Sequence, residues 1–345
     1  MYHPRLKGSP YEMGQKMGTI FKNSHARFPI QLDLFQTQFG RKSGKLLKQF
    51  FPEAAEEIRG VTDVLGIDNE IFTAWMMCMG CCMYNLGGDG VEVRGCTAFS
   101  FMHTGQITHA RNNDLPPFLK EVSKSIFYQP QGKHRFILNT SSFINGEEGI
   151  NERGLVAAMT FVMPKLDEIH PGINSVFLVR YLLENCATVD EGLAAIKKLP
   201  IASNCNILLT DRSGKMFVSE CSPLKIHIRQ PEKNNHGEQF IITVNHFTSP
   251  QMVEFEGGDH NIYLAETRYQ TVYAALKDME YSDGAEHAKT ILSGKHGFLC
   301  QYEKKNDFDT IWSSVFDITN QCVYRAEGNP GSTMFKEDTR LNFAL

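Results

Sequence analysis

The spacing of apolar residues changes its period near residue 95. From Ser9 to Leu86 apolar positions recur mostly at helical spacing, and two stripes carry this signal: Met13, Met17, Ile20 and Phe21, then Leu46, Phe50, Ala54, Ile58 and Val61. The stretch from Asn85 to Gly95 holds four glycines, Asp89 and Glu92, a composition typical of an exposed loop. We therefore predict a helical N-terminal segment over residues 1–95 that ends in a loop.

Short runs rich in Val, Ile, Phe and Thr follow this loop and predict strands. These runs are Ala98 to Met102, Ile107 to Arg111, Ile126 to Tyr128, Phe136 to Asn139, Leu155 to Val162, Ile207 to Asp211, Met216 to Cys221, Lys225 to Arg229 and Phe240 to Asn245, with a hairpin over Thr310 to Arg325. Helical spacing returns at Ser175 to Ala187, Val189 to Lys198, Leu264 to Met279 and Gly284 to Leu292. This grouping indicates an α+β fold of antiparallel sheets covered by helices, with residues 96–345 packed as one unit.

Composition narrows the classes of partner. The 345 residues are 42% hydrophobic and 21% charged, and the net charge of -4 offers no basic surface for a nucleic-acid backbone. The apolar run from Ile71 to Leu86 falls short of the ~20 residues that span a bilayer, so we expect a buried helix and no membrane partner. The start of the chain lacks the apolar core of a signal peptide. Nine cysteines without regular spacing favour a reducing cytoplasm over a disulfide framework.

A predicted hairpin gathers chemically active side chains around Cys96. A two-residue loop between His103 and Gln106 would place Cys96 near Asn113 and Ala98 opposite Arg111. Arg111 and Asp114 then lie at the end of the hairpin where Cys96 sits, with strands ~4.8 Å apart. A thiol, a cation and a carboxylate are expected to meet there.

Such neighbours suit a nucleophile, because a nearby cation favours the thiolate and lowers the pKa of a cysteine from its usual ~8.5. If the bond between Gly95 and Cys96 is cut, the freed α-amine can take the thiol proton, and Asp114 can orient that amine. Gly95 favours the cut because, without a Cβ, it can adopt strained backbone angles and let the thiol approach its carbonyl carbon.

Several short motifs together resemble one family. Around the candidate site they are Gly95-Cys96-Thr97-Ala98, Arg111-Asn112-Asn113-Asp114 and Asn151-Glu152-Arg153-Gly154-Leu155; elsewhere they are Val244-Asn245-His246-Phe247, Thr267-Arg268-Tyr269 and Trp312-Ser313-Ser314-Val315-Phe316-Asp317. Nearly end to end, the chain resembles the cysteine N-terminal nucleophile hydrolases, which group choloylglycine hydrolases, penicillin V acylases and penicillin-forming acyl-coenzyme A acyltransferases. The opening Gly8-Ser9-Pro10-Tyr11-Glu12-Met13-Gly14 looks like that of the acyltransferase-like branch.

The resemblance implies an αββα sandwich and a role for each matching residue. It implies Cys96 as nucleophile, Arg111 beside the sulfur, Asp114 at the α-amine, Asn245 as oxyanion donor and Arg268 in the supporting network. Bile-salt-cleaving relatives often have an asparagine where this chain has Thr160, so Thr160 is an oxyanion or substrate contact, or a backbone N–H takes that place. They also often have little ahead of the cysteine, so the 95 residues here make bile salts a less favoured substrate.

The implied activity is hydrolysis of a linear amide, a carbon–nitrogen bond other than a peptide bond, after self-cleavage of a zymogen. The expected partner is a small N-acyl amide, no metal or other cofactor is required, the cleaved chains are expected to stay associated, and a homo-oligomer is allowed. Two alternatives remain: an acyltransferase that passes the acyl group to an amine, and a binding protein that never matures.

Other interpretations of single residues remain open. His246 with Asp259 or Asn261 could complete a thiol site with Cys96 that needs no chain cleavage. Asn245 and Arg268 could be purely structural, and Asp114 could cap a turn with Pro116 and Pro117. Three cysteines without a second pair at metal-finger spacing are expected to pack in the core: Cys78, Cys81 and Cys82.

Overall fold

The hairpin predicted around residues 104 and 105 forms the centre of one sheet. In the computed structural model, which describes residues 1–26, 28, 30–79, 81, 95–279, 283–303 and 307–343, β2 (Gly95–His103) pairs antiparallel with β3 (Gln106–Leu115). Cys96 lies opposite Asn113 and Ala98 opposite Arg111, which confirms the predicted register. The two loop residues, Thr104 and Gly105, have φ angles of 48° and 80°, as a type I′ turn requires.

This hairpin belongs to a seven-stranded sheet with the order β11-β12-β2-β3-β13-β14-β15. Its other strands are β11 (Glu232–Lys233), β12 (Gln239–Thr243), β13 (Asp309–Asp317), β14 (Cys322–Ala326) and β15 (Lys336–Glu337). Strands β13 and β14 form the hairpin predicted over Thr310 to Arg325. Because β12 and β13 flank the central hairpin, they bring residues far apart in the sequence beside Cys96.

An eight-stranded sheet faces the first and has the order β1-β4-β5-β6-β7-β8-β9-β10. Its strands are β1 (Arg5–Gly8), β4 (Lys124–Pro130), β5 (Phe136–Thr140), β6 (Glu148–Asn151), β7 (Val156–Phe161), β8 (Cys205–Thr210), β9 (Met216–Cys221) and β10 (Ile226–Arg229). Strand β1 pairs parallel with β4, with Leu6 opposite Tyr128. The N-terminal segment therefore supplies a strand to this sheet, which the apolar pattern did not predict.

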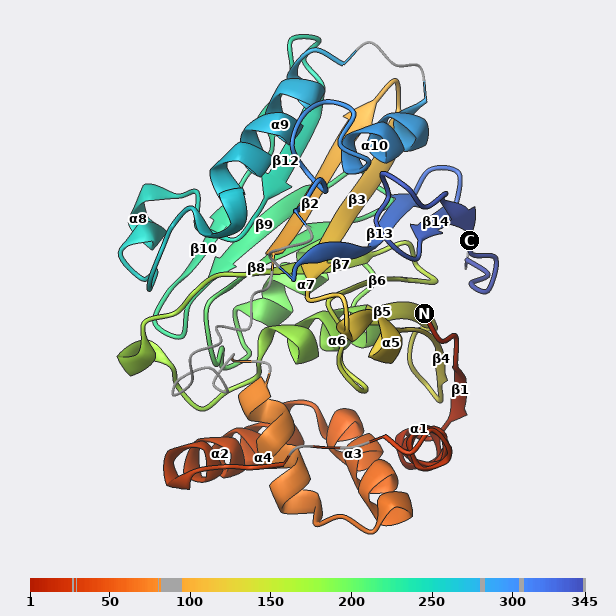
Figure 1. The fold of residues 1–345 in the computed structure, drawn as a ribbon, viewed down its shortest axis with the longest axis vertical. Coiled ribbons are helices and arrows are strands. Elements are labelled where there is room, and N and C mark those ends of the chain that lie inside the picture. Colours follow the sequence, from red (N-terminus) through yellow and green to blue (C-terminus); the bar gives the residue numbers. More distant parts are fainter. Residues whose placement is uncertain are drawn as a thin grey trace.

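Helices cover the outer faces of both sheets (Figure 1). Helices α6 (Ser175–Asn185) and α7 (Val189–Ile196) pack on the eight-stranded sheet, whereas α9 (Ala265–Lys277) and α10 (Gly284–Leu292) pack on the seven-stranded sheet. The inner faces meet where β2 and β12 contact β7 and β9. This αββα sandwich confirms the predicted fold class, and its helices match the four predicted helical runs.

The N-terminal helices form a further layer outside α6 and α7 (Figure 1). They are α1 (Pro10–Asn23), α2 (Leu34–Phe50), α3 (Pro52–Leu65) and α4 (Asn69–Met79). Capping boxes begin the first two: Ser9 with Glu12, and Asp33 with Gln36. The stripe from Leu46 to Val61 spans two helices, because α2 ends at Phe50 and Pro52 begins α3.

Shorter elements complete the chain: α5 (Leu119–Val122), α8 (Pro250–Val253) and the 3₁₀ turns η2 (Leu166–Glu168) and η3 (Ile262–Leu264). Residues 85–94 of the predicted loop and Cys82 lie outside the described residues, whereas Gly95 is the first residue of β2. Within the described ranges, no helix is both long enough and apolar enough to cross a membrane.

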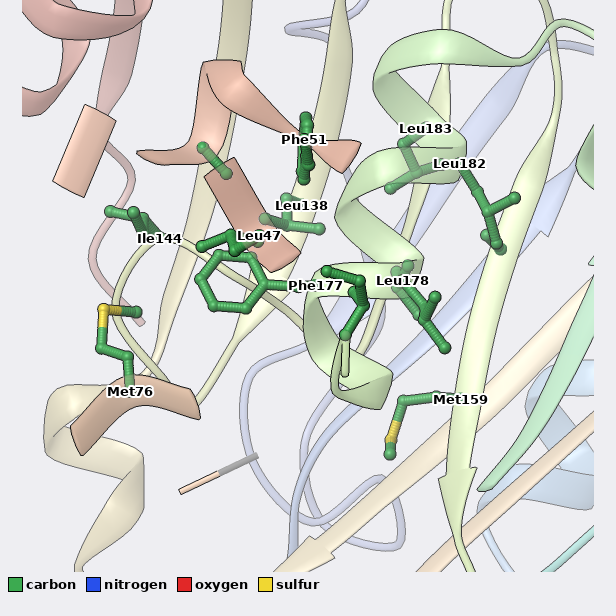
Figure 2. Packing of buried hydrophobic residues seen from close by; sticks show 14 of the residues in the cluster. Leu47, Phe51, Met76, Leu138, Ile144, Met159, Phe177, Leu178, Leu182 and Leu183 are labelled. Atoms are coloured by element: carbon green, nitrogen blue, oxygen red, sulfur yellow. The ribbon is translucent and has the colours of Figure 1, made fainter. Parts of the chain in front are cut away.

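The N-terminal helices share one hydrophobic core with the eight-stranded sheet. Figure 2 shows Leu47 and Phe51 near Leu138 of β5 and Phe177 of α6, and all four side chains are fully buried. Burying apolar surface of this kind contributes roughly 25 cal/mol per Å² removed from water. The helical segment is therefore packed as part of the fold.

A buried ion-pair cluster crosses the same boundary. Arg180 of α6 donates to Glu57 of α3 at 2.5 Å and to Glu184 at 3.1 Å, and all three side chains are fully buried. The hydroxyl of Tyr128 also donates to Glu57, at 3.0 Å. Because a buried guanidinium needs nearby negative charge, Glu57 ties the N-terminal helices to the core.

We predict that Glu57→Gln lowers the free energy of unfolding by about 3 kcal/mol, because it removes a carboxylate that pairs with a buried guanidinium. Glu56→Gln is the matched control and should cost at most about 0.5 kcal/mol, since the ion pair of Glu56 with Arg59 leaves about half of each side chain exposed. Urea unfolding followed by circular dichroism measures both variants. Equal, small losses would mean that Glu57 does not hold the boundary.

Candidate active site

Cys96 lies at the start of a central strand with its sulfur between the two sheets. Its side chain shares a face of β2 with Ala98, which packs against Ala158 and Leu208 of the opposite sheet. Only 3% of Cys96 is exposed. Arg111 Nη2 donates to the sulfur at 3.0 Å, and the thiol faces Asn113 Oδ1 at 3.7 Å. The predicted meeting of thiol and guanidinium is therefore present.

Arg111 is held by groups that the sequence did not single out. Its Nε donates to the carbonyl of Met159 at 3.1 Å, and its Nη1 lies 3.7 Å from Glu148 Oε2. Glu148 accepts from Trp312 Nε1 at 2.9 Å and from Ser314 Oγ at 2.5 Å. The Trp-Ser-Ser motif thus positions the carboxylate that pairs with Arg111, a link that only the fold reveals.

The charge state of Cys96 corrects one expectation. Burial raises the pKa of its thiol, and the opposing effect of Arg111 does not cancel that rise. The prediction of a lowered pKa is therefore wrong for the intact chain, because desolvation of a fully buried thiol outweighs one nearby cation. Arg111 still acts in the expected direction.

Arg268 and Asn245 hold the backbone of Cys96. Arg268 Nη1 donates to the carbonyl of Cys96 at 2.6 Å and to Thr97 Oγ1 at 2.8 Å, and its Nη2 donates to Asn245 Oδ1 at 2.9 Å. The same Oδ1 accepts the backbone N–H of Cys96 at 2.8 Å. Asn245 Nδ2 donates to the carbonyl of Phe161 at 2.9 Å, which leaves its second N–H for another acceptor.

Asp114 lies opposite Gly95 in the hairpin and is fully buried. It accepts from Thr310 Oγ1 at 2.6 Å and from the hydroxyl of Tyr302 at 2.9 Å, and Arg268 Nη1 lies 3.9 Å away. Burial raises the pKa of this carboxyl, with Arg268 acting against the rise. The backbone N–H of Cys96 bonds Asn245 in the uncut chain, so contact between Asp114 and an α-amine remains a prediction.

Gly95 is closely surrounded. A Cβ there would lie 2.9 Å from the Phe308 ring and 3.0 Å from Asp114 Cβ. Close packing therefore favours a glycine at this position, and its part in chain cleavage remains a prediction. Strain lies nearby at Tyr263 and Leu264, whose φ angles are 54° and 56°.

Thr160 is buried between the sheets on β7. Its hydroxyl donates to the carbonyl of Val244 at 2.5 Å and accepts from Asn206 Nδ2 at 3.1 Å. A hydroxyl has one hydrogen, so the hydrogen of Thr160 is engaged in this arrangement. Its role as an oxyanion or substrate contact remains a prediction.

The alternative thiol site is not assembled. His246 stacks on His260 with ring centroids 4.2 Å apart, and across the described residues it forms no hydrogen bond with Cys96, Asp259 or Asn261. Burial lowers the pKa of His246 to about 4. The Cys-His-Asp interpretation therefore remains a prediction that none of these contacts supports.

The sequence predicts that Cys78 and Cys81 pack in the core. The Cys78 thiol donates to the carbonyl of Gln36 at 3.3 Å, and both Cys78 and Cys81 are buried in an apolar cluster. This confirms the core packing predicted for these two residues. Among the described residues, no group of three or more metal-binding side chains gathers.

The fold and site define an αββα protein with a buried cysteine at the head of a central strand. The chain belongs to the acyl-coenzyme A:6-aminopenicillanic acid acyl-transferase family, whose model matches residues 103–332. That range includes Arg111, Asp114, Asn245 and Arg268, and begins after Cys96.

Comparison with solved structures also finds similar chains. Penicillin V acylase from Agrobacterium tumefaciens is 17% identical, with 72% of this chain and 87% of that chain covered and a TM-score of 0.46. A mutant form of conjugated bile acid hydrolase from Clostridium perfringens is 12% identical, with 72% and 98% covered and a TM-score of 0.38. Comparison with curated proteins gives no match.

We predict that in the intact chain Cys96 reacts with iodoacetamide at least about tenfold more slowly than Cys322, because burial hides its sulfur and raises its thiol pKa. Cys322 is the one partly exposed cysteine among the described residues. Peptide mass mapping over time gives both rates, and a peptide that still joins Gly95 to Cys96 identifies the uncut chains. The unfolded protein, where the two cysteines should react alike, is the control. Equal rates in the folded intact chain would contradict the buried site.

Proposed function

We propose that the protein is a self-maturing amidohydrolase that cleaves the linear carbon–nitrogen bond of an N-acyl compound through a thioester on Cys96. One observation carries the proposal: the sulfur of Cys96 and its backbone nitrogen are each held by a buried side chain. Arg111 donates to the sulfur at 3.0 Å, and Asn245 accepts from the nitrogen at 2.8 Å. A residue whose thiol and amine both react needs both atoms positioned.

Maturation begins with attack of the Cys96 sulfur on the carbonyl carbon of Gly95. The acyl group moves from nitrogen to sulfur, the thiol proton passes to the departing nitrogen, and water then hydrolyses the thioester. The products are a carboxylate at Gly95 and a free α-amine at Cys96. The raised thiol pKa of the uncut chain is compatible with a zymogen whose nucleophile stays largely protonated until this step.

Catalysis reuses the same atoms. The α-amine takes the thiol proton, the sulfur adds to the amide carbon, and the tetrahedral oxyanion collapses as the amine passes the proton to the leaving nitrogen. Water cleaves the thioester and restores the thiol. Arg111 stabilises the thiolate, Asn245 and Asp114 hold the amine, and Arg268 fixes Asn245. The second N–H of Asn245 is free to serve the oxyanion.

The cut segment is proposed to remain bound as a separate chain. Strand β1, the shared core and the Glu57–Arg180 pair all join residues 1–95 to the rest of the fold. A cytoplasmic location also belongs to the proposal. The eight cysteines that the structure describes are all thiols, which suits a reducing compartment.

Denaturing mass spectrometry tests maturation. The wild type is expected to give fragments 1–95 and 96–345 in place of the intact 39.0 kDa chain, and the two should elute together from a native sizing column. Cys96→Ala should remain intact, because no sulfur attacks Gly95. Cleavage of that variant at the same bond would refute the mechanism, and an intact wild type would favour a binding protein that does not mature.

An acyltransferase is the second candidate, favoured by the description of the family to which the chain belongs. The same thioester would pass its acyl group to an amine in place of water. We expect a purified N-acyl amide to give mainly free acid, both with and without an added primary amine. Liquid chromatography with mass detection distinguishes the products; a new amide that dominates when amine is present would establish transfer instead.

A further inference from the structure

We propose that Asn113 is a second hydrogen-bond donor to the oxyanion formed at Cys96, a role that rests on the amidase function proposed above. Asn113 is the residue of β3 directly opposite Cys96, so the two side chains share one face of the sheet. Its amide oxygen lies 3.7 Å from the sulfur. The terminal amide of Asn113 is therefore a neighbour of the reacting atom.

Asn113 lies between two paired strands and is almost fully buried. It is 1% exposed, and its backbone lies between Cys96 on one side and Trp312 on the other in adjacent strands. A donor held in a central strand and shielded from water interacts more strongly with developing negative charge than a donor on a mobile loop. Only the terminal amide has to rotate when the charge appears, because the strand holds the rest of the residue in place.

The other donors of the site are engaged to different degrees. The Thr160 hydroxyl donates to Val244, and one N–H of Asn245 donates to Phe161 while its second N–H stays open. Arg111 donates to Met159 and to the sulfur, and its Nη1, which has no hydrogen-bond partner among the described residues, lies 3.7 Å from Glu148 Oε2. Asn113 Nδ2 is a neutral donor that is buried and has no hydrogen-bond partner among the described residues. A buried amide without a partner costs about 1 to 3 kcal/mol. The unpartnered amide of Asn113 beside the nucleophile is explained if the oxyanion formed in the reaction accepts its hydrogen bond.

The chemistry places that acceptor within reach. When the sulfur bonds to the amide carbon, the π electrons of the carbonyl move onto its oxygen, which is then two bonds from the sulfur. In the thiol state Asn113 presents its oxygen to the S–H group. Loss of that proton removes the reason for this orientation, and rotation of the terminal amide by half a turn presents Nδ2 to the thiolate and to the oxyanion.

The test compares Asn113→Leu with wild type in the matured enzyme. Leucine keeps a similar size and removes both amide hydrogens. We expect kcat for an N-acyl amide to fall about 100-fold with KM changed less than about threefold, because the donor acts on the transition state. The melting temperature should not fall, since Nδ2 has no partner to lose.

Asn112→Leu is the matched control on the same strand. Asn112 faces away from the sulfur: it donates to the carbonyl of Leu292 at 3.1 Å and accepts from Ser313 Oγ at 2.6 Å. Its replacement should lower the melting temperature while leaving kcat within about threefold of wild type. Asn113→Leu should lower kcat but not the melting temperature, whereas Asn112→Leu should lower the melting temperature but not kcat. This difference distinguishes a catalytic role from a structural one. If Asn113→Leu fails to fold, Asn113→Ala, which only removes atoms, gives the same comparison.

Each outcome is decisive. A large loss in kcat at Asn113 with unchanged stability supports the donor role. If Asn113→Leu and Asn113→Ala keep activity within about threefold of wild type while Cys96→Ala is inactive, the donor role is overturned and the amidase proposal stands. If wild type and Cys96→Ala process the amide equally, the amidase proposal fails, and the donor role fails with it.

Discussion

The pairing of β2 with β3 is the constraint on which the rest of the site depends. A two-residue turn fixes which residues face each other, and this puts Asn113 opposite Cys96 and Arg111 opposite Ala98. A shift of one residue would turn the sulfur and the guanidinium to opposite faces of the sheet. Flanking strands β12 and β13 then surround this pair with partners that lie far away in the sequence, such as Asn245 at 149 positions from Cys96.

Burial gives the site its chemical character. Fully buried Cys96, Arg111, Asp114 and Arg268 form a set of charged and ionisable groups with almost no access to water. Desolvation raises the pKa of the thiol and of the Asp114 carboxyl, whereas the guanidinium groups act in the opposite direction. This balance is compatible with the proposed maturation, in which the nucleophile acquires its base, the α-amine, only when the chain is cut.

The N-terminal helices are as much part of the molecule as the sandwich. The helices contribute apolar side chains to the core of the eight-stranded sheet and Glu57 to the buried guanidinium of Arg180, and strand β1, which precedes them, pairs with β4 of that sheet. These non-covalent contacts would hold residues 1–95 in place after the proposed cleavage of the bond between Gly95 and Cys96. The proposed self-cleavage is therefore compatible with an intact fold.

Local patterns in the sequence were enough to predict the helices α6, α7, α9 and α10, the short strands after residue 95 and the register of the central hairpin. The reason is that apolar periodicity and a two-residue turn act over only a few positions. Only the tertiary structure decided the rest. Glu148 beside Arg111, Tyr302 and Thr310 on Asp114, and β1 beside β4 are all long-range contacts. The close packing of Gly95 against the Phe308 ring joins residues far apart in the sequence, and the burial that raises the thiol pKa exists only in the assembled fold.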